Sequence, residues 1–332
     1  MMIIYAVLIF CLLIFVHELG HFISAKSVGI RVNEFALGMG PLLFQFKKGE
    51  TEYSLRALPI GGYCKMEGED EESSDASAFN NKPFPAKALV VVAGSTMNLI
   101  LAVAILSAVM FAAGMPTNVI NELSPDLPAM RAGLLPGDRI VRIDDKEIEE
   151  WTDITDAISQ GSEKTVAVAV ERDGEVQSFT VDVVKAKDGR RIIGITPAYA
   201  KDPVKAIVYG TQSTFEMGGE MIKIIGQLIT GEVSTKNLTG PVGIVYIVGD
   251  TAKLGVLYLA QLTAFISLNL AIVNMLPFPA LDGGRLLFLV IRKMTGRTIS
   301  DETEGKIHFV GLMLLFGLMI YITFQDVGRF IL

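Results

Sequence analysis

The segment FVHELGHFIS, residues 15 to 24, places two histidines and a glutamate at the end of a strongly apolar run. On a helix, the i and i+4 spacing of His17 and His21 sets both imidazoles on one face, where they can bind one Zn²⁺. Glu18 is then placed to act as general base on a zinc-bound water. Ionisable side chains in a membrane span cost at least about 2.5 kcal/mol each at mid-depth, so they usually mark a function. The motif therefore predicts a catalytic zinc site.

The five-residue pattern alone occurs often by chance, so its context matters. The chain contains only three histidines, and two of them belong to the motif. The alternative is that these polar side chains merely hydrogen-bond between helices. That role does not call for these three residue types at this spacing, and we favour the metal site.

A third metal ligand must come from elsewhere, because a catalytic zinc usually has three protein ligands and an open position. Asp282, within NMLPFPALDGGR, is our candidate. Two prolines and two glycines interrupt the helical pattern around it, namely Pro277, Pro279, Gly283 and Gly284. Broken backbone at membrane depth is tolerated only where it is buried in protein or lines a wet cavity. The remaining histidine, His308, is interpreted as an interfacial or packing residue.

The composition sets the class of protein that must position these residues. Of 332 residues, 51% are hydrophobic and 20% charged, and the mean hydropathy is +0.46. These values indicate an α-helical integral membrane protein. The net charge of −7, without a basic stripe, argues against a nucleic-acid partner. Cys11 and Cys64 offer neither a disulfide framework nor a metal-binding spacing.

Four segments are apolar and long enough to cross a bilayer, since about 20 such residues span its hydrocarbon. They are roughly residues 2–25, 87–113, 254–277 and 307–325. The first lacks a basic start and a small-residue cleavage site, so we expect it to be retained rather than removed as a signal peptide.

Lysine and arginine are concentrated in the loops between spans 1 and 2 and between spans 3 and 4. The amino terminus has none, and the carboxyl tail has only Arg329. By the positive-inside rule, both loops are cytoplasmic and both termini lie outside. The motif of span 1 and Asp282 then share the cytoplasmic side. The expected protein is a multi-pass protein of the cell (inner) membrane.

Residues 115–200 differ in kind from the apolar segments. VAVAVERDGEVQSFTVDVV predicts two strands joined at Asp173-Gly174, and TDITDAISQ predicts a short helix. AGLLPGDRIVRIDDKEI resembles a PDZ domain, a class that binds peptides by adding a strand to a sheet edge. A β domain without a peptide ligand is the alternative. We call residues 115–200 the PDZ-like unit and expect it outside the cell membrane.

The rest of the chain divides around this unit. The predicted divisions are a first membrane part, the PDZ-like unit, an amphipathic surface helix with a connector, and a second membrane part, at residues 1–114, 115–200, 201–253 and 254–332. Alternation predicts a cytoplasmic, membrane-associated β-hairpin at 44–58. The acidic run at 67–77 is expected to be a solvated, mobile loop.

HELGH in the first span, NMLPFPALDG near the end of the third, AGSTMN in the second and the PDZ-like unit together resemble the site-2 protease family of intramembrane zinc metalloproteases. The match covers nearly the whole chain. The resemblance implies that His17, His21 and Asp282 bind Zn²⁺, that Glu18 is the catalytic base, and that Asn274, Asn98 and Gly94 are substrate-binding candidates.

The resemblance also implies a reaction. The substrate would be a single-pass membrane protein, cut within its transmembrane segment after another protease has removed its outer part. Anti-sigma factors and signal-peptide remnants are substrates of this kind. The cytoplasmic hairpin would pair with an unwound stretch of substrate. The alternatives are a non-catalytic, PDZ-bearing membrane scaffold and a zinc protease that cuts misfolded proteins at the membrane surface.

Overall fold

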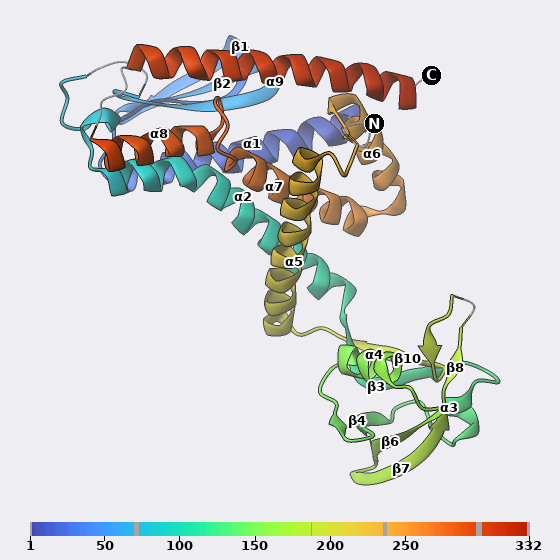
Figure 1. The fold of residues 1–332 in the computed structure, drawn as a ribbon. Helices are drawn as coiled ribbons and strands as arrows, with labels where there is room; N and C mark the ends of the chain where they lie inside the picture. Colours follow the sequence, from blue (N-terminus) through green and yellow to red (C-terminus); the bar gives the residue numbers. More distant parts are fainter. Residues whose placement is uncertain (1, 70–72, 187, 235–237, 297–300, 331–332) are drawn as a thin grey trace. The chain divides into compact units, whose positions relative to one another are not determined.

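The computed structural model describes residues 2–69, 73–186, 188–234, 238–296 and 301–330. It divides into two compact units, Met1–Val109 with Ile207–Leu332, and Met110–Ala206 (Figure 1). The first unit holds nearly all of the apolar helices, and the second contains the whole of the PDZ-like unit.

Four helices of the described chain are long and apolar enough to cross a membrane. They are α1 (Met2–Ser27), α2 (Phe84–Ala113), α7 (Val256–Asn274) and α9 (Asp301–Phe330). A helix satisfies its backbone groups internally, which a membrane span requires. The prediction of four apolar helices is confirmed, with changes at their ends.

The third span ends earlier than predicted, and a further helix follows it. α7 stops at Asn274, whereas the apolar pattern of the sequence continues to residue 277. A non-helical loop, residues 275–281, leads to the amphipathic helix α8 (Asp282–Thr295), where we expected only a loop. A Cβ atom on Gly283 or Gly284 would lie 2.3 Å from a carbonyl oxygen of this loop. These glycines therefore let the start of α8 pack directly on the loop.

The predicted hairpin is part of a larger sheet. β1 (Val32–Lys48) and β2 (Thr51–Met66) pair antiparallel over almost their full length. Residues 32–37 pair with 62–66 on one side, and 34–37 pair with 52–55 on the other. Residues 42–48 pair with 51–56. The chain bends between these stretches at Gly38 and Gly40, which have φ of +86° and +81°. Strand residues 62–66 form one edge, with no strand beyond them in the described chain.

Three helices complete the first unit together with a short 3₁₀ turn, η1 (Phe79–Asn81). One is α8. α5 (Pro203–Thr230) packs Met217 and Met221 against α2 and α7, and it leaves other apolar side chains exposed. α6 (Pro241–Leu254) packs on α1 and α7. The predicted division of residues 201–253 therefore contains this second helix in addition to the amphipathic one.

The PDZ-like unit is a sheet with strand order β10-β3-β4-β6-β7, and β5 pairs with β4. Its elements are β3 (Met115–Leu123), α3 (Pro128–Arg131), β4 (Arg139–Ile143), β5 (Lys146–Glu147), α4 (Trp151–Gln160), β6 (Thr165–Arg172), β7 (Glu175–Asp182), β8 (Val184–Lys185), β9 (Arg191–Ile192) and β10 (Ile195–Ala200). The hairpin at Asp173-Gly174 is confirmed, because both residues have positive φ and Arg172 pairs with Glu175.

Two contacts hold the ends and the centre of this unit in place. Met115, its first strand residue, pairs with Ala200, its last, so the two ends of the unit are adjacent. Asp138 is 1% exposed and accepts two hydrogen bonds of 2.7 Å from Arg172. Burial alone would raise the pKa of Asp138, but these bonds outweigh it and hold the pKa below its usual range.

Candidate active site

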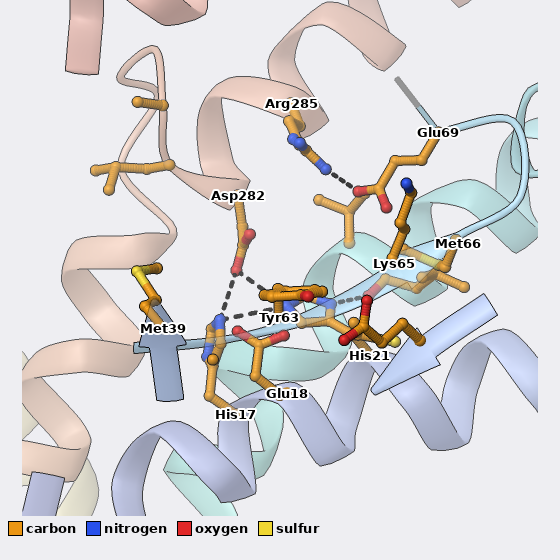
Figure 2. Close-up of a pocket in the computed structure, with 17 residues that line it drawn as sticks. His17, Glu18, His21, Met39, Tyr63, Lys65, Met66, Glu69, Asp282 and Arg285 are labelled. Atoms are coloured by element: carbon orange, nitrogen blue, oxygen red, sulfur yellow. Dashed lines mark hydrogen bonds and ion pairs between the residues drawn. The ribbon is translucent and has the colours of Figure 1, made fainter. Parts of the chain in front are cut away.

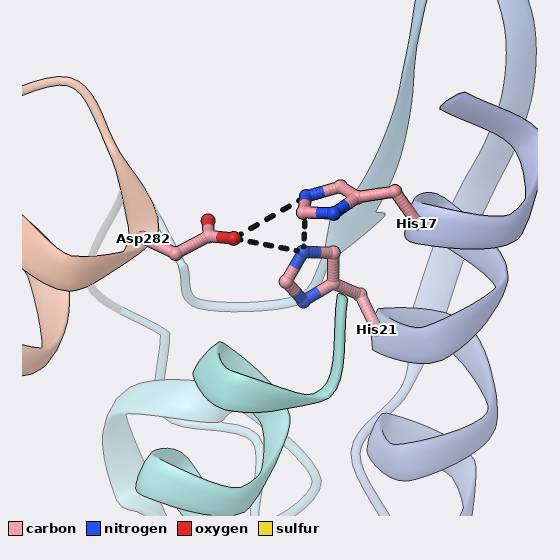
Figure 3. A group of neighbouring side chains, drawn as sticks. All are labelled: His17, His21 and Asp282. Carbon is pink, nitrogen blue, oxygen red and sulfur yellow. Dashed lines mark hydrogen bonds and ion pairs between the residues drawn. The ribbon is translucent and has the colours of Figure 1, made fainter. Parts of the chain in front are cut away.

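Three side chains from two distant parts of the sequence meet beside the second half of α1. His17 and His21 extend from consecutive turns of α1, and Asp282 is the first residue of α8 (Figure 3). The two Nε2 atoms are 3.2 Å apart. Asp282 Oδ2 is 3.3 Å from Nε2 of His17 and 3.6 Å from that of His21. The structure thus brings together the three residues expected to bind metal.

The spacing of these three atoms suits a zinc ion. In a tetrahedral site with bonds of about 2.0–2.1 Å, two ligand atoms lie about 3.3–3.4 Å apart. The observed edges of 3.2, 3.3 and 3.6 Å are close to that value. The carboxylate and imidazole atoms are also ligand types that zinc prefers. Among the described residues, His17, His21 and Asp282 form a group of three potential ligands that are close enough together to hold one metal ion.

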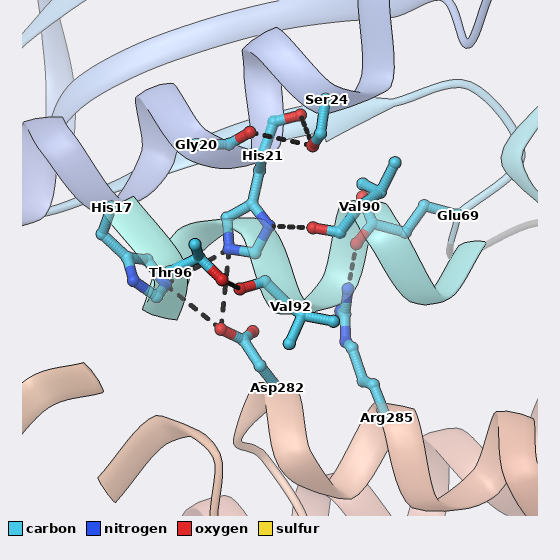
Figure 4. A network of polar contacts seen from close by, with 10 residues as sticks. All are labelled: His17, Gly20, His21, Ser24, Glu69, Val90, Val92, Thr96, Asp282 and Arg285. Carbon is cyan, nitrogen blue, oxygen red and sulfur yellow. Dashed lines mark hydrogen bonds and ion pairs between the residues drawn. The ribbon is translucent and has the colours of Figure 1, made fainter. Parts of the chain in front are cut away.

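His21 is oriented by a hydrogen bond on its other ring nitrogen. Its Nδ1 lies 2.8 Å from the carbonyl oxygen of Val90 in α2 (Figure 4). A carbonyl can only accept, so Nδ1 carries the proton and Nε2 is free to bind a metal. Such a partner fixes both the tautomer and the ring orientation of a metal ligand.

Two glycines allow α1 and α2 to approach closely at the site. A Cβ atom on Gly94 would lie 2.3 Å from His21 Nε2 and 2.7 Å from His17 Cε1. A Cβ atom on Gly20 would lie 2.4 Å from the carbonyl oxygen of Ala93. Gly94 therefore leaves the space that both imidazoles occupy. A sequence pattern cannot show this, because it depends on which helix packs against α1.

A cavity of about 720 Å³ opens beside the three side chains (Figure 2). Glu18 lies in it next to His17. Strand residues 62–66 line the cavity, and a Cβ atom on Gly62 would be 3.3 Å from Cγ of Glu18. The edge of the sheet is thus placed against the expected catalytic base. The sequence pattern missed this stretch, because its alternation extends only over residues 44–58.

Charged groups of the sheet are fixed around the cavity. Glu34, which lines it, accepts hydrogen bonds from Ser54 Oγ at 2.5 Å and Arg56 Nη2 at 2.9 Å. Burial alone would raise the pKa of Glu34, but these hydrogen bonds outweigh it and lower the pKa, so the group stays ionised near neutral pH. Arg56 also donates to the carbonyl of Gly40 at 3.0 Å. It therefore ties the bend of β1 to β2.

The acidic run is exposed at residues 74–76, as expected of a solvated loop, but two of its carboxylates are held by other parts of the chain. Glu67 accepts hydrogen bonds from Asn33 at 2.8 Å and Ser73 at 2.7 Å. Glu69 is 12% exposed, lines the cavity and forms an ion pair with Arg285 of α8. Residues 70–72 lie outside the described residues. Composition alone predicts solvation, whereas this carboxylate is held by a cation 216 positions away in the chain.

The three substrate-binding candidates take different places. Gly94 lies directly under the imidazoles. Asn98 is fully buried, and its backbone carbonyl accepts a hydrogen bond from Ser267 at 2.8 Å. Asn274 ends α7 and is partly buried. Neither asparagine is among the residues that line the cavity. His308 lies outside the group of three and contacts the loop before Asp282.

Known proteins match this chain over nearly its whole length. The model of peptidase family M50 matches residues 5–318. The regulator of sigma-W protease RasP of Bacillus subtilis is 32% identical, with 98% of both chains covered. The zinc metalloprotease RasP of Geobacillus kaustophilus is also 32% identical, over 98% of this chain and 97% of that one. A relative from Clostridium acetobutylicum, whose name designates a zinc metalloprotease, is 38% identical over 98% and 97%.

Among solved structures, the PDZ domain of the SdrC-like protein of Listeria monocytogenes aligns with 25% of this chain and 88% of its own, at 22% identity and a TM-score of 0.23. The family match covers most of the chain, and the relatives match it almost from end to end. The chain therefore belongs to peptidase family M50, the site-2 protease family, and is a zinc intramembrane metalloprotease.

Proposed function

We propose that His17, His21 and Asp282 bind the catalytic zinc, that Glu18 is the general base, and that the enzyme hydrolyses peptide bonds within the transmembrane segments of single-pass membrane proteins. One observation carries the assignment: three ligand atoms from α1 and the start of α8 have tetrahedral spacing and line a cavity that Glu18 also lines. When bound, zinc would act as a Lewis acid on water and on the scissile carbonyl.

The protein's own residues supply the rest of the chemistry. Glu18 takes a proton from the attacking water and passes it to the leaving amine. His21 keeps its metal-binding nitrogen unprotonated through its bond to Val90. The start of α8 favours the Asp282 carboxylate, because the N-terminal end of a helix carries partial positive charge.

A transmembrane substrate must unwind before it can be cut, since a helix hides its amides in internal hydrogen bonds. Strand residues 62–66 offer an edge that can replace those bonds by strand addition. This edge lines the cavity beside Glu18, so it is better placed for pairing than the 44–58 hairpin expected from the sequence. The 42–48 stretch instead exposes Leu42, Leu43, Phe44 and Phe46, which suits contact with the bilayer interface.

The lysine and arginine counts support a cytoplasmic active site, with both termini and the PDZ-like unit outside the cell (inner) membrane. The name of the Bacillus subtilis relative identifies that protein as a regulator of a sigma factor. By analogy, the substrates of this chain are anti-sigma factors or signal-peptide remnants already trimmed by an upstream protease. The PDZ-like unit would filter or dock the trimmed ends.

The test combines bound zinc with cleavage of a transmembrane test peptide in proteoliposomes. We expect wild-type protein to bind zinc and cut the peptide, and Glu18→Gln to bind zinc equally but lose nearly all cleavage, since only the base is removed. Turnover like wild type in Glu18→Gln would refute the assigned base. Zinc binding without any peptide cleavage would favour the scaffold. Cleavage of unfolded soluble protein with the transmembrane peptide left intact would favour the surface protease.

A further inference from the structure

We propose that His308 of α9 is a positioning residue for Asp282. Its imidazole accepts a hydrogen bond from the backbone N–H of Ala280 and so holds the 275–281 loop in the conformation that points the Asp282 carboxylate at the two histidines. This role rests on the metal-ligand role proposed for Asp282.

The loop has one strained residue close to the ligand. Ala280, two positions before Asp282, has φ of +76°. This left-handed conformation is unfavourable for a residue with a side chain and persists only where the surroundings enforce it. The contacts of Ala280 therefore bear directly on where α8, and with it Asp282, begins.

The amide groups of the loop can be fully accounted for. Pro277 and Pro279 have no N–H. The N–H groups of Met275, Leu276, Phe278 and Leu281 all donate to carbonyls between residues 272 and 278. The N–H of Ala280 is the exception, because it donates to Nδ1 of His308 at 2.9 Å. Without an acceptor at position 308, a partly buried amide would lose its partner, which is unfavourable.

The surroundings of His308 prepare it for this bond. A backbone N–H can only donate, so Nδ1 is unprotonated and the ring proton of the neutral side chain is on Nε2. Nε2 lies 3.7 Å from Oε1 of Glu304, whose Oε2 is 2.5 Å from Nη2 of Arg292 in α8. The imidazole also packs 5.6 Å from the ring of Phe288. The His308 side chain is only 18% exposed, so its orientation is well defined.

α9 also packs against the loop just beyond His308. A Cβ atom on Gly311, one turn further, would lie 2.5 Å from Cβ and 2.6 Å from the carbonyl oxygen of Pro279. On the other side, a Cβ on Gly284 would lie 2.3 Å from the carbonyl oxygen of Phe278. The loop is thus enclosed between α8 and α9, and the hydrogen bond to His308 fixes its position between them.

Two substitutions separate the hydrogen bond from simple packing. His308→Asn keeps an acceptor oxygen near the position of Nδ1, whereas His308→Phe keeps the ring and its contact with Phe288 but removes the acceptor. Each full-length variant is purified in detergent beside wild type and Asp282→Ala. The measurements are Zn²⁺ affinity by competition with a chromophoric chelator, the visible absorption of the Co²⁺-loaded protein, and thermal unfolding of the metal-free protein.

We expect His308→Phe to lose on the order of 10–100-fold in Zn²⁺ affinity, as is typical when a partner that orients a metal ligand is removed. Its Co²⁺ spectrum should change, because the geometry of one ligand changes. His308→Asn should retain most of the affinity and a spectrum like wild type. Metal-free His308→Asn should unfold at a temperature like wild type, and metal-free His308→Phe only slightly lower, as expected for the loss of one hydrogen bond. If His308→Phe does not fold, His308→Gln takes its place with the same expected loss, because its acceptor lies one bond further from the backbone.

Three results would overturn this role. Zinc affinity and a Co²⁺ spectrum like wild type in His308→Phe, with Asp282→Ala impaired, would show that Asp282 is a ligand that needs no help from His308. Equal losses in His308→Asn and His308→Phe would show that the hydrogen-bond acceptor is not what matters. Zinc affinity like wild type in Asp282→Ala would instead remove the ligand assignment itself and the positioning role with it.

Discussion

Gly94 is important for the site because it has no side chain. The space where its Cβ would lie is occupied by the imidazoles of His17 and His21, and a real Cβ contact is essentially never as short as the 2.3 Å found there. Because Gly94 lies inside α2, where glycine is less favourable than alanine, its presence has a cost in helix stability. The close approach of two helices at the metal site accounts for that cost.

Gly94→Ala should therefore displace both imidazoles. We expect a loss on the order of 10–100-fold in zinc affinity, with a similar fall in peptide cleavage, because both histidines change their geometry. Chelator competition measures the affinity. Gly226→Ala in α5 is the matched control, since a Cβ there meets nothing within 4 Å and should leave zinc binding unchanged. Equal behaviour of the two variants would contradict the steric role.

Among individual residues, the sequence predicted those whose type and spacing alone indicate their chemistry. Histidines at i and i+4 indicate a metal site, and prolines and glycines around an aspartate indicate a broken helix. Gly62, Glu69 and Arg285 could not be found in this way. Their roles depend on which distant segment lies beside them, as when Glu69 meets Arg285 across the cavity.

Among the elements, α6 begins at a carboxylate from another helix. Asp326 of α9 is 1% exposed and accepts hydrogen bonds from the N–H groups of Gly240 at 3.2 Å and Gly243 at 2.8 Å. These amides lie at the start of α6, where N–H groups lack partners within the helix and the dipole favours negative charge. Asp326, an ionisable residue in an apolar helix, therefore has a structural role, which is to cap the start of α6.

Asp326→Ala should lower the free energy of unfolding by roughly 1–2 kcal/mol, the cost of losing a helix cap. Asp326→Asn should cost less, because its amide oxygen still accepts one of the two bonds. Denaturant unfolding in mild detergent gives these values. Thr323→Ala serves as the control, since the Thr323 hydroxyl donates to the carbonyl of Met319 in its own helix, and its effect should stay within about 0.5 kcal/mol. A loss in Asp326→Ala no larger than in this control would contradict the capping role.

The elements were predicted best where one period runs unbroken. Apolar runs predicted α1, α2, α7 and α9, and alternation around Asp173-Gly174 predicted β6 and β7. The sheet of β1 and β2 was underestimated, because the bends at Gly38 and Gly40 shift its register and interrupt the alternation. Helix α8 was missed, since the many charged and glycine residues around it resemble a loop.

For the whole molecule, the direction of insertion can be tested with two matched serines. Ser74 lies in the acidic run and Ser178 in β7, and neither is buried. In a variant with Cys11 and Cys64 replaced by serine, we expect Ser178→Cys to react with an impermeant thiol reagent added to intact cells. Ser74→Cys should react only after the membrane is opened, because the lysine and arginine counts predict that its loop is cytoplasmic. The opposite labelling would invert the topology.

The adjacent ends of the PDZ-like unit make its removal a clean experiment. Met115 pairs with Ala200, so a short flexible linker can replace residues 115–200 without stretching the chain. We expect the shortened enzyme to cut a minimal transmembrane peptide at a rate close to that of wild type and to begin cutting substrates that keep their outer domains. A folded, zinc-loaded deletion variant that no longer cut the minimal peptide would place the unit in the catalytic machinery.

The edge formed by residues 62–66 has a consequence for which proteins the cell can keep safely in the same membrane. Strand addition uses backbone amides and carbonyls, which are the same in every amino acid except proline, so these hydrogen bonds by themselves do not distinguish one sequence from another. How readily a substrate helix unwinds then contributes to which substrates are cut. We expect stable transmembrane helices to be cleaved slowly and those with glycine, proline or polar interruptions to be cleaved faster. The stability of its own transmembrane helix would then protect a membrane protein from cleavage.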